Sequence, residues 1–235
     1  MMQDIVDLID FYATPLGKTT AATIRGLLNQ LWADINIDTL MTMGYPIPFI
    51  SETGNIHRTL VFMPAAQGII HWPDEAKNQC CLINEDTLPL PNESVDRILI
   101  IHSLEHAEHI RPYLRELWRV LASNGRLTVI VPNRRGLWAQ MDETPFGHGN
   151  PYTMTQLSRI LKENQFTPLR SLRGLYNIPS HSRILKNLSK VLEKIGPLCL
   201  TKFSGLVCIE ASKQVYCGYH AKKPPRILIR SALVN

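Results

Sequence analysis

Apolar residues recur at helical spacing near the start of the chain. Between Asp4 and Tyr12 four apolar side chains fall on one face, and this spacing predicts an amphipathic helix. Pro15 and Gly17 interrupt the pattern, and the same spacing then resumes from about Thr19 to Trp32. We therefore expect two consecutive helices before the main body of the domain.

Beyond Trp32 the apolar residues form short runs, each bounded by polar residues, glycine or proline. Runs of this length suit strands that are buried on both faces, as in a parallel sheet covered by helices. The five runs are Thr39–Met43, Thr59–Met63, Cys80–Ile83, Arg97–Ile101 and Leu127–Val131.

Helical patterns alternate with strand-like ones through the rest of the chain. A helix is expected over Arg111–Leu121, ended by Ser123-Asn124-Gly125, and a capping box at Thr153 and Gln156 opens another that runs to about Asn164. This alternation predicts an α/β fold with a doubly wound sheet. The later elements are a strand near Leu169–Leu175, a helix over Ser182–Ile195 and a strand over Leu206–Ala211.

Charge divides the chain into a neutral body and a basic end. All of the formal excess of +5 follows Glu210, beyond which no acidic residue occurs. A neutral body lacks the broad basic face of a nucleic-acid binder, so no nucleic-acid partner is expected. We expect one domain over residues 1–215, with a helical cap at 1–34 and a core at 38–213, followed by a basic tail at 216–235.

No apolar run approaches the roughly 20 residues that a membrane-spanning helix needs. The early residues are acidic where a secretory signal would be basic, and the five cysteines include no C-x-x-C pair. These features favour a cytoplasmic protein without a membrane span. The Ser182–Ile195 helix has a lysine-rich face, which suits either a solvated surface or peripheral contact with an anionic membrane. We expect the solvated surface.

An ordered series of short motifs lies between Glu85 and Asn133. The series is Leu88-Pro89-Leu90-Pro91, Ser94-Val95-Asp96, Leu104-Glu105-His106, Arg119-Val120-Leu121, Asn124-Gly125 and Val131-Pro132-Asn133. It resembles the class I S-adenosylmethionine-dependent methyltransferases that act on small molecules, over roughly residues 38 to 166. The resemblance implies a mostly parallel, seven-stranded Rossmann-like sheet, S-adenosylmethionine as cofactor and a small-molecule methyl acceptor.

The glycine-rich turn of that family is degenerate in this chain. The family has three glycines after the first strand, where the backbone approaches the cofactor closely. Gly44 keeps the first position, whereas Pro46 and Pro48 hold the other two. Thr42 stands where an acid is usual, and the second strand ends at Met63 and Pro64 without the ribose-binding acid.

The resemblance implies which residues contact the cofactor. Asn84 stands in place of the acid that receives the adenine amino group, with Glu85 beside it, and His102 ends the fourth strand. Tyr12, at the end of the first helix, is a candidate to close over the cofactor, and the alternative for it is a packing role. The full expected set is Gly44, Tyr45, Met63, Asn84, Glu85, His102 and Tyr12.

One histidine is a candidate catalytic residue. His148 lies between Gly147 and Gly149 in a loop after the fifth strand, on the side where substrates enter. Because histidine titrates near neutral pH, His148 is a candidate general base. The alternative is a turn in which His148 is solvated or bonded to backbone.

Two further interpretations of function remain open. Pro46, Pro48 and the missing acids favour a binding or scaffold protein that keeps the methyltransferase fold with a decayed cofactor site. His102 and His106 form an H-x-x-E-H string, which in a metallohydrolase places both histidines on one helix. Because His102 directly follows a strand, we expect no metal.

Overall fold

In the part of the chain that the structure describes, seven strands form one sheet in the order β3-β2-β1-β4-β5-β7-β6. The computed structural model describes residues 3–32, 36–50, 55–176 and 203–214. Every strand pair is parallel except those of β7, which runs antiparallel to both neighbours. The strands are β1 (Asn36–Gly44), β2 (Asn55–Pro64), β3 (Cys80–Ile83), β4 (Val95–Ile101), β5 (Leu121–Pro132), β6 (Phe166–Gly174) and β7 (Leu206–Lys213).

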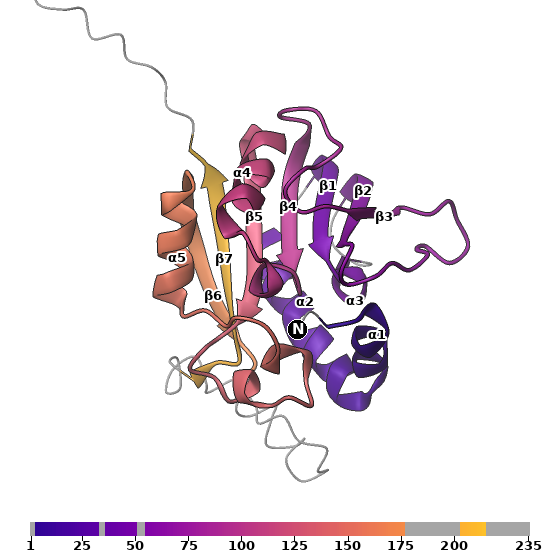
Figure 1. The fold of residues 1–235 in the computed structure, drawn as a ribbon, viewed down its shortest axis with the longest axis vertical. Helices are drawn as coiled ribbons and strands as arrows, with labels where there is room; N and C mark the ends of the chain where they lie inside the picture. Colours follow the sequence, from indigo (N-terminus) through magenta and orange to yellow (C-terminus); the bar gives the residue numbers. More distant parts are fainter. Residues whose placement is uncertain (1–2, 33–35, 51–54, 177–202, 215–235) are drawn as a thin grey trace, which may run out of the picture.

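Helices cover the sheet and form one apolar core on each face. Helices α1, α2 and α3 contribute to the first core, and α4 and α5 contribute to the second. Figure 1 shows α1 and α3 beside the ends of β1 and β4 at which those strands finish. The helices are α1 (Ile5–Ala13), α2 (Pro15–Trp32), α3 (Ile47–Ile50), α4 (Ile110–Val120) and α5 (Met154–Glu163), with short 3-10 turns η1 (Leu104–His106), η2 (Leu137–Gln140) and η3 (Pro145–Gly147).

The predicted fold class is confirmed. β1 pairs with β4 in parallel, and β7 is antiparallel, as the motif series implied. The strand at the far edge is β6, because β7 inserts between β5 and β6. The β3 bounds agree with the predicted Cys80–Ile83, and α5 begins at the predicted capping box of Thr153 and Gln156.

The second helix begins one turn earlier than predicted. Pro15 was expected to break the helical pattern, but it is the first residue of α2, where its fixed φ and missing N–H are tolerated. Gly17 then lets the two helices meet closely, since a Cβ there would lie 2.0 Å from the carbonyl oxygen of Phe11.

The predicted bounds Arg111–Leu121 agree with α4 to within one residue, but the expected stop at Ser123-Asn124-Gly125 is wrong. Leu121 is already the C-cap residue, and it pairs with Val95 of β4. Pairing with β4 therefore draws the chain into β5 directly after the helix, and Ser123-Asn124-Gly125 lies within that strand.

Some predicted features fall outside the described residues. These are the Ser182–Ile195 helix and the basic tail at 216–235. Among the helices that the structure describes, none combines the length and apolar character needed to cross a membrane.

Candidate functional site

The turn after β1 brings two strand ends into close contact. Gly44 has φ of 95°, and a Cβ on it would lie 2.0 Å from the carbonyl oxygen of Ile101 in β4. The amide of Tyr45 donates to the same oxygen at 3.2 Å. Only glycine satisfies both the left-handed backbone and the close approach, so the geometry requires glycine at position 44.

Tyr12 of α1 covers this turn. Its hydroxyl shares a buried hydrogen bond of 2.7 Å with Nε2 of His102, the residue that follows β4. The Tyr12 ring lies 5.9 Å from that of Tyr45 and 5.2 Å from that of Phe49 in α3, measured between centroids. Tyr12 is only 6% exposed and Phe49 is fully buried. Aromatic rings therefore occupy the space over the ends of β1 and β4.

Four buried polar atoms near the carboxyl ends of β2, β3 and β4 lack a hydrogen-bond partner. They are Oε1 of Gln67 after β2, Oε1 of Glu85 after β3, Nδ1 of His102 after β4 and Oε2 of Glu105 in η1. An unsatisfied buried polar group costs about 1–3 kcal/mol, so such groups are rare and need an explanation. Their concentration at one edge of the sheet marks a place suited to a polar ligand.

Burial also sets the charge of His102 and Glu105. It lowers the pKa of His102 to about 3, with a further contribution from His106, and raises the pKa of Glu105 to about 7. The 3.7 Å approach of His102 Nδ1 to Glu105 Oε1 is therefore a contact between neutral groups at mildly acidic pH. In the described residues no opposite charge faces this pair closely enough to restore ionisation.

The structure brings together four of the seven predicted cofactor residues, which are Gly44, Tyr45, His102 and Tyr12. The side chain of Met63 belongs to the apolar core of the first face. Asn84 is exposed, and its Oδ1 accepts a bond from the amide of Asp86 within a local turn. These positions leave contact with a cofactor as a prediction for all seven.

Glu85 lies at the β3 end of the same edge. Burial, together with smaller contributions from the nearby Asp86 and Glu108, raises the pKa of its carboxyl to about 7. A carboxyl that is partly protonated at neutral pH can both donate and accept hydrogen bonds.

Sequence reasoning missed two residues of this site, Gln67 and Phe49. Nε2 of Gln67 donates to the carbonyl oxygen of His102 at 2.9 Å, and Gln67 is 1% exposed. The available signal was a single polar side chain after Pro64-Ala65-Ala66, a turn of small apolar residues. For Phe49, which lies in an apolar stretch, the sequence carried no signal.

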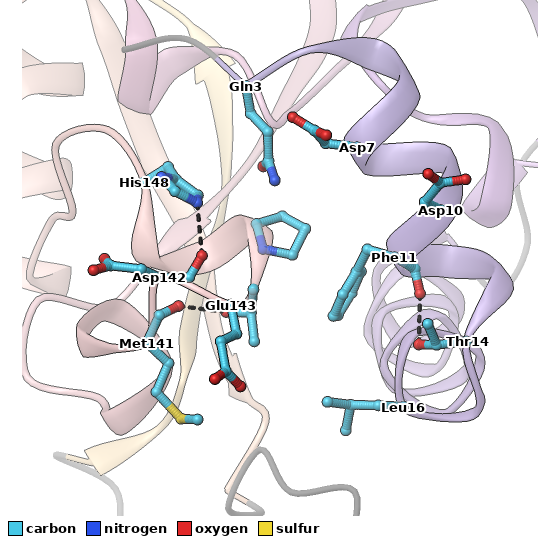
Figure 2. Close-up of a pocket in the computed structure, with 12 residues that line it drawn as sticks. Gln3, Asp7, Asp10, Phe11, Thr14, Leu16, Met141, Asp142, Glu143 and His148 are labelled. Atoms are coloured by element: carbon cyan, nitrogen blue, oxygen red, sulfur yellow. Dashed lines mark hydrogen bonds between the residues drawn. The ribbon is translucent and has the colours of Figure 1, made fainter.

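His148 lines a separate cavity between α1 and the segment that joins β5 to α5. The cavity has a volume of about 450 Å³ and is bordered by Asp7, Asp10, Asp142 and Glu143. Figure 2 shows His148 on the wall that faces Asp7 and Gln3. Its Nε2 donates to the carbonyl oxygen of Asp142 at 2.9 Å. This is the backbone contact of the alternative interpretation, and a role as general base stays a prediction.

The two histidines of the H-x-x-E-H string do not share a helix. His102 follows β4, whereas His106 ends η1. Within the described ranges no group of three or more His, Cys, Asp or Glu side chains is arranged to hold a metal ion.

Comparison with known proteins places this arrangement in a recognised fold. Residues 67–129 match the family model of a methyltransferase domain. A Thermotoga maritima S-adenosylmethionine-dependent methyltransferase, described as a possible histamine N-methyltransferase, aligns with a TM-score of 0.61 at 12% identity, over 89% of this chain and 96% of that one. No curated protein matches the chain significantly.

Two further solved structures share the fold. The YcgJ protein of Bacillus subtilis has a TM-score of 0.51 at 11% identity, over 82% of this chain and 99% of that one. A geranyl diphosphate methyltransferase in complex with S-adenosylmethionine has a TM-score of 0.52 at 15% identity, over 82% of this chain and 85% of that one. At these identities the likeness shows the fold alone.

Proposed function

We propose that this chain, which has the class I methyltransferase fold and matches a methyltransferase domain over residues 67–129, binds S-adenosylmethionine and methylates a small molecule. The cofactor would bind at the ends of β1 to β4, where ligands of open parallel sheets are held. The observation that carries the proposal is the set of four unpaired buried polar atoms at this edge.

The polar groups of the edge suit S-adenosylmethionine. Oε1 of Gln67 and Oε2 of Glu105 lack partners and could accept from ammonium or hydroxyl donors, and Oε1 of Glu85 lacks a partner near the expected adenine position. Gly44 lets the backbone approach the ligand without a Cβ in the way. When bound, S-adenosylmethionine supplies a methyl group activated on a sulfonium.

In this structure aromatic side chains fill the space over this edge of the sheet. Cofactor entry therefore requires Tyr12 to break its 2.7 Å bond with His102 and move away from Tyr45 and Phe49. Apparent affinity falls in proportion to the fraction of molecules that are open. We accordingly propose weaker cofactor binding than in a protein whose site is already open.

The residues of this chain contribute positioning more than acid–base chemistry. Methyl transfer depends mainly on holding the acceptor in line with the methyl group. Phe146, whose ring centroid lies 5.2 Å from that of His102, would exclude water beside the strand ends. His148 is the candidate base where the acceptor must lose a proton.

A thermal-shift titration tests the proposal. S-adenosylhomocysteine should raise the melting temperature in a dose-dependent manner, because a ligand that binds only the folded state stabilises it by RT ln(1 + [L]/Kd). Uridine at equal concentrations serves as the control nucleoside and should leave the melting temperature unchanged. An absent shift with millimolar S-adenosylhomocysteine would refute cofactor binding.

A second candidate function is a binding module whose cofactor crevice is permanently filled. The buried bond between Tyr12 and His102 and the packing of Tyr12 on Phe49 favour it. The same titration separates the two candidates, since a permanently filled crevice shows no response to S-adenosylhomocysteine at any concentration.

A further inference from the structure

A second cavity lies farther along the same edge of the sheet, where β5 and β6 end and α5 begins. Pro132 of β5 and Gly174 of β6 both pair with Leu206 of β7, so the two strand ends stand at one level. The cavity has a volume of about 640 Å³, within the range of small-molecule sites. Its lining is Asn133, Arg134, Arg135, Thr153, Met154, Thr155, Gln156 and Arg173.

The charge of this lining has one sign. Among the described residues that line the cavity, three are arginines and none is acidic. Among the ion pairs of the described residues, neither Arg134 nor Arg135 has a carboxylate partner. The guanidinium groups of Arg134 and Arg135 in this concave site create a positive potential that is strengthened by the low-dielectric walls.

Arg134 is held in place without being neutralised. Its Nε donates to the carbonyl oxygen of Pro151 at 3.1 Å, which leaves both terminal nitrogens available. The backbone around it is also fixed, because the Arg134 amide donates to the carbonyl oxygen of Tyr152 at 3.2 Å. A guanidinium with free terminal N–H groups matches the paired oxygens of a phosphate or a carboxylate.

The start of α5 adds donors to the same wall. Thr153 and Gln156 cap each other reciprocally, so their amides are satisfied. The amides of Met154 and Thr155 have no acceptor within the helix, since an α-helix leaves its first turn unpaired. The positive end of the helix dipole thus reinforces the arginines.

We propose that this cavity binds the anionic group, a phosphate or a carboxylate, of the methyl acceptor. The cavity opens at the same edge of the sheet as the proposed cofactor site, so an acceptor bound there would lie on the cofactor's side of the sheet. The proposal rests on the proposed function only in identifying the ligand as the acceptor. The recognition of an anion follows from the cavity itself.

The test is a calorimetric titration of the full chain with inorganic phosphate at low ionic strength. The double variant Arg134→Gln, Arg135→Gln should bind phosphate at least about tenfold more weakly, because charge-assisted hydrogen bonds are lost. Arg159→Gln is the matched control, because Arg159 lies on α5 but is exposed and pairs with Glu163. Its phosphate affinity should equal that of the unmodified chain.

A parallel titration with acetate shows whether the site accepts a carboxylate as well as a phosphate. Circular dichroism checks that each variant is folded, which is expected because Arg134 and Arg135 are exposed. Equal phosphate affinity in the double variant and the unmodified chain would overturn the proposal. So would the absence of phosphate and acetate binding at tens of millimolar.

The two proposals fail separately. If phosphate binding depends on Arg134 and Arg135 but S-adenosylhomocysteine gives no response, the anion site is supported and the proposed methyltransferase function is refuted. If S-adenosylhomocysteine gives a response but neither phosphate nor acetate binds, cofactor binding is supported and the anion site is refuted.

Discussion

Glycine at position 44 is required for both conformation and space. Alanine there would place a Cβ in a left-handed backbone and 2.0 Å from the Ile101 carbonyl oxygen. Gly44→Ala should therefore lower the free energy of unfolding by about 3 kcal/mol or more, measured by urea denaturation. Gly26→Ala is the matched control, since nothing lies within 4 Å of a Cβ at this helical position. It should raise stability by about 0.5–1 kcal/mol, and equal losses in both variants would contradict this explanation.

The carboxyl of Glu105 makes stability depend on pH. Its folded pKa of about 7 exceeds the ordinary value of 4.5, so the unfolded state loses its proton first as pH rises. Stability attributable to Glu105 is thus present below pH 4.5 and lost as pH rises to 7. Between pH 5 and pH 8, the free energy of unfolding of the unmodified chain should fall by about 2 kcal/mol relative to that of Glu105→Gln.

His102 is present in both proteins, so its own pH dependence largely cancels in that comparison. Because the pKa of His102 is lowered in the fold, His102 destabilises the folded state as pH falls below 6.5, which is the opposite pH dependence to that of Glu105. A stability difference between the unmodified chain and Glu105→Gln that stays constant from pH 5 to pH 8 would show that Glu105 is not buried as described.

The residues of the candidate site were only partly predictable. Gly44 and His102 follow from motifs that lie next to strands, and the structure places both at the expected strand ends. The bond from Tyr12 to His102 joins residues 90 positions apart, and no local pattern encodes such a pairing. Gln67 was missed for the same reason, because its importance comes from its contact with the His102 backbone.

At the level of elements, α4 holds the loop that precedes β4. Arg119 donates to the carbonyl oxygens of Leu88 and Leu90 and pairs with Glu116 at 2.8 Å. Glu116 in turn accepts from the amide of Leu88. We call these contacts of Arg119 and Glu116 with the loop the Arg119 clamp. It explains why an arginine near the helix end accompanies the Leu-Pro-Leu-Pro motif.

Loss of the clamp should be measurable. Arg119→Ala should lower the free energy of unfolding by about 2 kcal/mol, since it leaves several carbonyl and carboxylate groups without a donor. Arg115→Ala, an exposed change on the same helix, should stay within about 0.5 kcal/mol. Comparable losses from the two variants in urea denaturation would argue against a specific role for Arg119.

Element bounds were predicted less well than element types. The apolar runs located all five early strands, because buried parallel strands are continuously apolar. The structure extends β2 back to Asn55 and β5 back to Leu121. Those added residues are held by pairing with β1 and β4, which depends on the whole sheet rather than on local sequence.

At the scale of the whole molecule, α1 couples the N-terminal segment to the ligand-binding edge of the sheet. Tyr12 contacts residues that follow β1 and β4, and Ile5 bonds to the backbone of Gln67 after β2. Movement of α1 would therefore expose three strand ends together. The order of the sheet was predictable from the motif series, whereas this closure was not, because it depends on contacts between distant segments.

Calorimetric titration of S-adenosylhomocysteine into the unmodified chain and Tyr12→Ala tests the central claim most directly. Removing the ring that covers Gly44 should raise the open fraction, and we expect this gain to exceed the loss of any contact between the Tyr12 ring and the cofactor. The variant should therefore bind at least about tenfold more tightly than the unmodified chain. Ile9→Ala, on α1 but 37% exposed, is the control and should bind as the unmodified chain does. The predicted result is a measurable heat of binding, with a tighter affinity in Tyr12→Ala than in the unmodified chain. The absence of heat with both the unmodified chain and Tyr12→Ala at millimolar ligand would contradict the central claim.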